Sequence, residues 1–370
     1  MINVALDVHV RNSYLKARSP SGQMLAGGRV PNTLMDLSRE LAGVEREALA
    51  SGEPVRAVME ATTNSRAMVQ LLERYGQQAG LDLTVDVLDP RKLRVIAEST
   101  AKCDRLDTQM LLELAGSNLK LPVCHVPDDE AFAVREHLRA RADLVKVQTM
   151  LKNRTHAVLH RRGVLRPPRM DLFSGRGQQF LREVELDAAG RQIVERFASA
   201  LSRVQEEIKA SEGELKRVSR QDRWREPVAL LTTMPGVPGV GLITAMTILA
   251  ELGDVDRFPN RGAVSHYASL TPKVRESNGR HTGGGGLARG GNRHLRHVLV
   301  EAAWRARDQV PAYQAIFTRV AMRRGKSIAI VAVARRMLED GWTMLKRREP
   351  FRYARPAACG SGDASIERAG

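Results

Sequence analysis

The sequence is poor in cysteine and has no cysteine pair with the spacing of a zinc or redox site. Its three cysteines, Cys103, Cys124 and Cys359, are an odd number without a C-x-x-C motif, which is typical of a reducing compartment. No run of about 18 apolar residues occurs, so we predict no membrane span. The N-terminal stretch MINVALDVHV lacks a basic block and carries Asp7 within its apolar run. We therefore expect a cytoplasmic protein without a secretion signal.

Charge is distributed unevenly along the 370 residues, of which 43% are hydrophobic and 27% charged. These are values of a globular chain, and the length predicts two or three domains. The net charge is +16, yet residues 1–125 hold 15 basic and 15 acidic side chains, whereas residues 261–350 hold 18 and 6. Such an excess in one segment favours contact with a polyanion. A solvated basic surface remains the alternative.

The first 125 residues have an alternating pattern of strands and helices. Three apolar, β-branched runs come first, followed by helix, strand, helix, strand and helix. This order is typical of a ribonuclease-H-like (RuvC-like) α/β domain, which we assign to residues 1–125. The strands are expected at 2–9, 13–17, 23–30, 55–60 and 83–88, and the helices at 33–50, 65–79 and 102–115.

The remaining chain is predicted to be mainly helical. Apolar stripes over residues 126–226 indicate a coiled-coil-like helical hairpin or an oligomer seam. Residues 227–350 form the next predicted domain, with helices at 242–252, 292–306 and 327–346. The glycine-rich stretch 234–241 before the first of these resembles a helix-hairpin-helix element that can hold a DNA phosphate, or a turn between core helices. We expect the tail, 351–370, to be disordered.

Four acidic residues stand out by their positions in the predicted α/β domain. Asp7 lies within the first strand and Glu60 at the end of the fourth, while Asp104 and Asp107 share one face of a predicted helix. Clustered carboxylates repel one another unless a cation neutralises them, and oxygen ligands select Mg²⁺ or Mn²⁺. Two such ions suit in-line displacement at a phosphodiester. A solvated strand end for Glu60 and a helix N-terminal preference for Asp104 are the plainer interpretations.

Ser277 is the second candidate for chemistry. It lies in a polar loop before four consecutive glycines, with basic residues on both sides. A serine hydroxyl needs a base, a metal or local positive charge to act as a nucleophile, and this loop supplies cations and flexible backbone. Most serines in such loops only make turns. Nearby arginines expected to contact nucleic acid are Arg275, Arg280, Arg289, Arg293 and Arg296.

Taken together, the motifs resemble a known family. The stretches ALDVH, VMEATTNS and KCDRLDTQML, which hold the four acids, resemble the DEDD domain of insertion-sequence transposases of the IS one-ten (IS110) family. The stretches MPGVPGVGLITAMTILAELGDVDRF and HYASLTPKVRESNGRHTGGGGLARGGNRHLRHVLVEAAW resemble its C-terminal transposase domain. The resemblance extends from Asn3 to about Lys346. One difference is that Asn278 separates Ser277 from Gly279, whereas the family often has Ser directly before Gly.

The resemblance implies a function that the pattern alone does not. Members of this family are recombinases that act on donor and target DNA, guided by a bridge RNA that the element encodes. Asp7, Glu60, Asp104 and Asp107 match the metal-binding tetrad, and Ser277 matches a nucleophile that forms a phosphoserine with the cleaved strand. The acids of one subunit and the serine of another would complete the site, which implies a homo-oligomer, a dimer or tetramer, that associates with the nucleoid when it acts.

Two other functions fit parts of the same pattern. A metal-dependent, structure-selective nuclease such as a Holliday-junction resolvase needs the four acids but no serine. A non-catalytic nucleic-acid-binding protein needs neither, and the acids then only stabilise the fold.

Overall fold

A computed structural model describes residues 1–96, 104–117, 119–234, 241–272, 276–277, 280–281, 286–287 and 290–352. At positions 94–96, 104–107, 276–277 and 280–281 it describes the backbone only. Two compact units divide the chain, Met1–Pro127 and Asp128–Gly370. Within the described ranges, no helix is both long and apolar enough to cross a membrane.

A five-stranded mixed sheet forms the centre of the first unit. Its strand order is β3-β2-β1-β4-β5. The first three strands are antiparallel neighbours, whereas β1, β4 and β5 run parallel. The chain therefore has the mixed α/β architecture that the alternating pattern predicted, with strands close to the expected positions. They are β1 (Ile2–Val8), β2 (Asn12–Arg18), β3 (Met24–Pro31), β4 (Val55–Glu60) and β5 (Leu83–Leu88).

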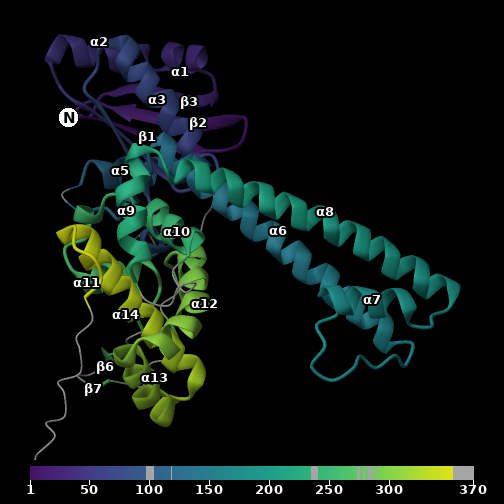
Figure 1. Cartoon of the computed structure of the whole chain (residues 1–370). Helices are drawn as coiled ribbons and strands as arrows, with labels where there is room; N and C mark the ends of the chain where they lie inside the picture. Colours follow the sequence, from purple (N-terminus) through teal and green to yellow (C-terminus); the bar gives the residue numbers. More distant parts are fainter. Residues whose placement is uncertain are drawn as a thin grey trace, which may run out of the picture. The chain divides into compact units, whose positions relative to one another are not determined.

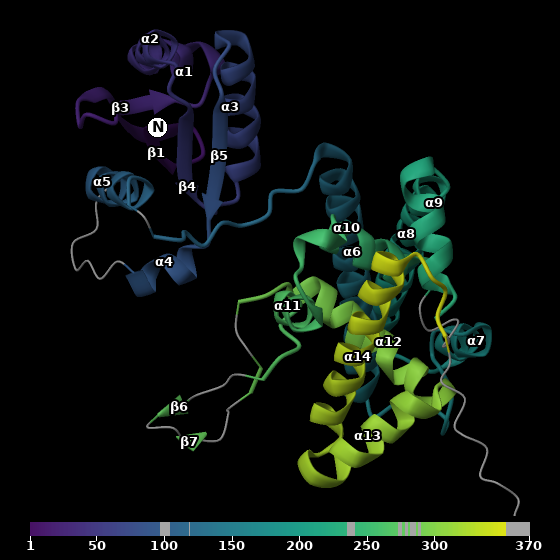
Figure 2. The ribbon, with the colours of Figure 1, turned by 90° about the vertical axis from the view of Figure 1, so that its left-hand side faces the viewer.

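Helices cover both faces of this sheet (Figure 2). On one face, α1 (Leu34–Glu40), α2 (Ala42–Ser51) and α3 (Ser65–Ala79) pack on the larger hydrophobic cluster. On the other face, α4 (Pro90–Ile96) and α5 (Asp104–Ala115) pack on a smaller cluster. The sequence did not predict α4. The sheet is thus the middle of three layers, and its two faces have different helical partners.

The single helix predicted over residues 33–50 is wrong, because the chain breaks at Leu41 into α1 and α2. Leu41 is buried and leaves helical geometry at φ −87° and ψ 5°. The hydroxyl of Tyr75 on α3 donates to the Leu41 carbonyl over 3.2 Å. Gly43, just after the break, lies so close to the carbonyl of Leu25 on β3 that a side chain would collide with it. The break therefore follows from tertiary packing, which helical periodicity does not report.

A long helical hairpin begins the second unit. Figure 1 shows α6 (Asp129–His160) and α8 (Ala188–Val218) side by side, with α7 (Gly175–Glu183) at the end far from α9–α14. Side-chain caps start the two long helices, since Asp128 accepts from the Ala131 amide and Asp187 from the Gly190 amide. The predicted stripes provide the packing, with Leu151, Leu201 and Leu215 among the buried residues. Two facing helices are one of the two arrangements that the sequence pattern predicted.

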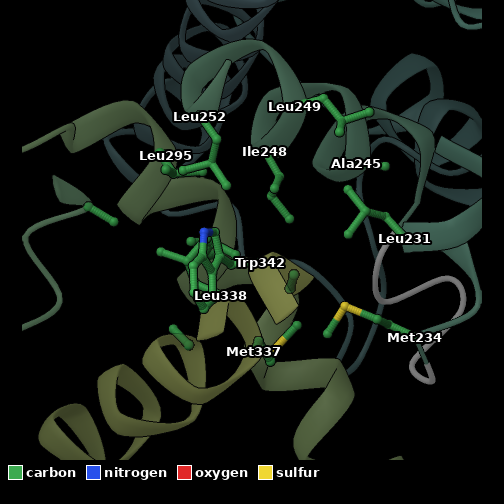
Figure 3. Packing of buried hydrophobic residues seen from close by; sticks show 14 of the residues in the cluster. Leu231, Met234, Ala245, Ile248, Leu249, Leu252, Leu295, Met337, Leu338 and Trp342 are labelled. Carbon is green, nitrogen blue, oxygen red and sulfur yellow. The ribbon is translucent and has the colours of Figure 1, made fainter. Parts of the chain in front are cut away.

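A helical body follows the hairpin, and its core is the largest hydrophobic cluster of the described residues (Figure 3). Ile248, Leu252, Leu295 and Leu338 meet there, and the first turns of α6 join the same core. The prediction for 242–252 is confirmed, and 292–306 and 327–346 are helical but longer. Three other helices were not predicted. The elements are α9 (Asp222–Thr232), α10 (Leu242–Leu252), α11 (Arg261–Tyr267), α12 (Arg293–Gln309), α13 (Pro311–Arg324) and α14 (Lys326–Arg347), with a 3-10 turn at Val255–Arg257.

Candidate active site

Asp7 and Glu60 lie on the same face of the sheet, at the ends of neighbouring strands. Side chains alternate along a strand, and Ala5 and Val58 pack in the cluster beneath α5. Asp7 and Glu60, two residues further along β1 and β4, therefore share that face. The strands are parallel and pair Leu6 with Met59, so the two acids directly follow adjacent partners. The expectation that the first and fourth strands are neighbours is confirmed.

Helix α5 packs against the same face of the sheet. It contributes Leu111, Leu112 and Ala115 to the cluster that contains Ala5 and Val58. Near its start, Thr108 is buried, and Gln109 accepts a 2.7 Å hydrogen bond from the Lys16 ammonium on β2. The backbone of Asp104 and Asp107 forms the first turn of this helix. Only the backbone of these two residues is described, so the structure gives their place in the helix but no side-chain contact.

Asp7 is held partly out of solvent. Its side chain is 24% exposed, and its Oδ2 lies 3.3 Å from Nε2 of His9, the second residue beyond it. Glu60 is also half-buried, at the last position of β4. Carboxylate oxygens at such positions are the ligands that a hard cation such as Mg²⁺ prefers. Among the described side chains no group of three or more metal-binding residues lies together, and the other two predicted ligands are not among them.

Ser277 lies in a short two-stranded hairpin. β6 (Glu276–Ser277) pairs antiparallel with β7 (Arg280–His281), and Ser277 is opposite Arg280. A further bridge joins Pro272 to Leu287. The side chains of Ser277 and Arg280, and the whole of Arg275 and Arg289, lie outside the described residues. The backbone register alone places a serine and an arginine side by side in the loop.

The two ends of this loop are fixed to one another. The Gly291 amide donates to the Ser269 hydroxyl over 2.7 Å, and the Asn292 amide donates to the Tyr267 carbonyl over 2.7 Å. Ser269 itself has φ +53°, a conformation that costs a non-glycine residue about 1–2 kcal/mol. At Gly291 a Cβ atom would collide with these same partners. The loop of residues 270–290 therefore leaves and re-enters the helical body at one closely packed point.

A buried ionic network supports this point. Glu251, at 1% exposure on α10, lies 3.4 Å from Arg135 and 3.0 Å from Arg139, both on α6. Its Oε2 accepts a 2.7 Å hydrogen bond from the side-chain amide of Asn292. The side-chain oxygen of Asn292 in turn caps α12, because it accepts a hydrogen bond from the Leu295 backbone amide. The Glu251 carbonyl accepts from the Tyr267 hydroxyl. The Glu251 carboxylate thus connects α10 with α6 and the start of α12, and its backbone carbonyl adds the link to α11.

Sequence reasoning missed this network, although one signal was present. Glu251 is the one charged residue of the apolar helix 242–252, and a carboxylate in such a setting needs a partner. Of the arginines predicted to contact nucleic acid, Arg293 is exposed and Arg296 half-buried on α12. Residues 235–240 of the predicted helix-hairpin-helix lie outside the described residues.

Comparison with known proteins places the chain among transposases. Residues 4–162 match the family model DEDD_Tnp_IS110, described as a transposase, and residues 228–316 match the model of the transposase IS116/IS110/IS902 family. The two matches lie in the same order as the acidic and the serine-containing segments. The chain belongs to the IS110 family of insertion-sequence transposases.

Several curated relatives are similar over most of the chain. The transposase for insertion sequence element IS1111A of Coxiella burnetii is 26% identical, over 75% of this chain and 76% of its own length. The putative transposase y4qE of Sinorhizobium fredii is 26% identical, over 71% of this chain and 62% of its own. The probable family 20 transposase of Pseudomonas aeruginosa is 23% identical, over 81% of this chain and 86% of its own.

Proposed function

We propose that the chain cleaves DNA strands and exchanges them between a donor and a target, with an RNase-H-like N-terminal domain that holds the metal. The observation that carries this proposal is the position of Asp7 and Glu60 at the ends of adjacent parallel strands, on the sheet face that α5 covers. The first turn of α5 carries the other two acids of the predicted tetrad. A divalent cation needs such a convergence of oxygen ligands.

The metal would be held by Asp7, Glu60, Asp104 and Asp107. When bound, Mg²⁺ or Mn²⁺ supplies positive charge that polarises a scissile phosphate and stabilises the oxygen that leaves it. The protein orients these ligands by packing the strands and α5 around one small hydrophobic cluster. Lys16 shares the face, because β2 pairs it with Ala5, and its ammonium adds a fixed positive charge.

Ser277 is the proposed nucleophile. Its Oγ attacks the scissile phosphorus and forms a phosphoserine ester, while the strand's own P–O bond breaks and leaves a hydroxyl end. The serine hydroxyl loses its proton to a base in the solvent. The leaving oxygen takes up one proton from the solvent and becomes the hydroxyl end. In the second half the hydroxyl end of an exchanged strand attacks the phosphoserine and releases the serine. Two transesterifications conserve the number of P–O bonds, so no external energy source is needed.

Other parts of the chain would hold the strands. Arg275, Arg280, Arg289, Arg293 and Arg296 flank the serine in sequence and suit bidentate contacts to backbone phosphates. Pairing with an element-encoded bridge RNA would supply target sequence, which leaves the protein to recognise backbone and shape. A serine from one subunit acting with acids of another requires at least two copies of the chain, and the family resemblance implies a dimer or tetramer.

The test is recombination between donor and target plasmids by purified protein with its RNA transcript. We expect Asp7→Asn and Ser277→Ala each to abolish recombination, whereas Asp82→Asn, an exposed acid at the opposite end of the sheet, keeps full activity. A nicked suicide substrate should trap a protein–DNA adduct that depends on Ser277. Cleavage that survives Ser277→Ala without an adduct would identify a metal-dependent nuclease. Full activity without the RNA would exclude guidance.

A further inference from the structure

The hairpin ends in a folded head rather than in a tight turn. Antiparallel helices are commonly joined by 2–5 residues, but here residues 161–187 separate α6 from α8. They include α7 and two loops, and Figure 1 shows them at the end of the hairpin that lies far from α9–α14. We call residues 151–187 the hairpin head.

The head has a hydrophobic core of its own. Val158 and Leu159 of α6, Leu172, Leu181 of α7 and Val194 of α8 are buried together, in a cluster separate from that of the helical body. The chain reverses within the head through Gly163, at φ +68°, and Ser174 caps α7 by accepting from the Gly177 amide. A separate core and capped elements fix the shape of the head, so side chains on its surface are presented from a rigid base.

Basic charge is concentrated on this head. Residues 151–182 contain eight Lys and Arg and one acid, Asp171. The shaft of the hairpin is nearly neutral, with four basic and four acidic residues over 129–150 and six and five over 188–218. Three acids follow at 183–187, of which Asp187 pairs with Arg162. The contrast with the shaft shows that the charge does not arise from the composition of a long solvated helix.

Most of these cations have no acidic partner within the described residues. Arg162 is the exception, because it pairs with Asp187. The Lys152 ammonium lies 5.2 Å from the centre of the Phe173 ring, a contact that leaves its charge unpaired with an acid. Arg166 donates to the Met170 carbonyl, which fixes its loop without neutralising its charge. Arg169 has φ +62°, a conformation that a non-glycine residue keeps only where the surroundings determine it. The exposed arginines are Arg154, Arg161, Arg166, Arg169, Arg176 and Arg182.

We propose that the hairpin head is a nucleic-acid-binding surface that contacts the phosphodiester backbone of a duplex. Seven of its eight cations are arginine, whose planar guanidinium matches phosphate oxygens better than a lysine ammonium does. A backbone contact requires exposed, uncompensated and pre-positioned cations, and the head provides them. This surface goes beyond the proposed function, and it depends on neither the acids nor the serine.

The test compares two triple substitutions in the full-length protein. The head variant is Arg161→Glu, Arg169→Glu and Arg176→Glu. The control is Arg203→Glu, Lys209→Glu and Lys216→Glu, which makes the same charge change at exposed positions of α8. Fluorescence anisotropy with one labelled 30-base-pair duplex, made once as DNA and once as RNA, gives Kd as a function of salt. Circular dichroism checks that each variant is folded. If the Glu substitutions unfold the head, the same three arginines are changed to Gln instead.

We expect the head variant to bind at least about tenfold more weakly at low salt. Its salt slope should fall by about three, close to one for each phosphate that the variant no longer binds. The control should change Kd less than about threefold. Weaker binding of the head variant to only the DNA duplex or only the RNA duplex supports the proposal and identifies which of the two duplexes the head binds. Equal effects of the two variants, or no effect on either duplex, overturn it.

Photocrosslinking provides a direct second measurement. Leu165 is 84% exposed in the middle of the head, whereas Leu49, 60% exposed on α2, is a comparable position outside it. A p-benzoylphenylalanine at position 165 should crosslink to the labelled duplex, and the same residue at position 49 should not. A duplex that crosslinks at neither position, or equally at both, contradicts the assignment.

Discussion

Replacing Glu251 with alanine tests whether the buried network determines the stability of the helical body. Glu251 and Arg135 are 1% and 8% exposed, so their charges are compensated mainly by each other and by the groups around them. After Glu251→Ala, the Arg135 guanidinium keeps its bonds to the carbonyls of Ala250 and residue 251 but loses its counter-charge. Removing one partner of a buried pair costs about 3–5 kcal/mol, because an uncompensated charge remains. For a unit of this size, that lowers Tm by on the order of 10 °C.

Thermal unfolding followed by circular dichroism at 222 nm is suitable, because the second unit is almost entirely helical. Glu251→Gln should cost less than Glu251→Ala, since the amide oxygen can still accept from Arg139 or Asn292. Asp143→Ala is the control, because it removes an exposed pair with Lys146 on the same hairpin and should leave Tm unchanged. A destabilisation below about 1 kcal/mol for Glu251→Ala would refute the reasoning, and would mean that the charges are hydrated in solution.

Hydrogen exchange connects the same substitution to the serine loop. The amides of Gly291 and Asn292 are bonded to Ser269 and Tyr267 at the loop ends. Asn292 also bonds to Glu251, so Glu251→Ala should accelerate exchange of these amides more than exchange within α14. Equal acceleration throughout the second unit would mean that the network stabilises the fold without fixing the loop in particular.

Three further substitutions test the second unit. Gly291→Ala should destabilise by about 1–3 kcal/mol in urea unfolding, because the new Cβ collides with Tyr267 and Ser269, whereas Gly213→Ala on the open face of α8 should stabilise by up to about 1 kcal/mol. Hydrogen bonds from Arg223 hold the pKa of Asp128 well below its usual range. The stability that this pair contributes is therefore fully present above the unfolded-state pKa of about 4, and it is lost as the pH falls from there toward the lower pKa of the folded state. Asp128→Asn keeps the cap of α6 but should flatten the acid limb of a Tm-against-pH profile; an unchanged limb would contradict this.

The sheet was predictable because each strand signal is local. Alternation and β-branched residues mark Ile2–Val8 and Val55–Glu60, and the acids at their ends stand out from apolar surroundings. The pairing of these two strands followed from the order of the elements, and the structure confirms it. Alternation also assigns Asp7 and Glu60 to one face once the core side of the strand is known.

The loop ends were not predictable, because they depend on distant residues. Glu251 meets Arg135 across 116 positions and Asn292 across 41 positions, and no single segment contains a pattern that reports either contact. The break at Leu41 is a similar case, since Tyr75 and Leu25 determine it from other elements. In both cases a local signal existed, a buried acid or a glycine within a helix, but its meaning required the fold.

Local pairing in the C-terminal segment sharpens what its charge means. Four of the six acids of residues 261–350 lie beside an arginine within four positions in the chain, so they are compensated where they stand. The pairs are Arg307–Asp308, Arg335–Glu339, Arg336–Asp340 and Glu349–Arg352. Of the other two acids, Glu276 directly precedes Ser277. Residues 273–289 around it hold four basic side chains and this one acid, and phosphate is the anion that would neutralise the excess. The first unit holds equal numbers of basic and acidic side chains up to residue 125, so attraction for nucleic acid depends on the second unit.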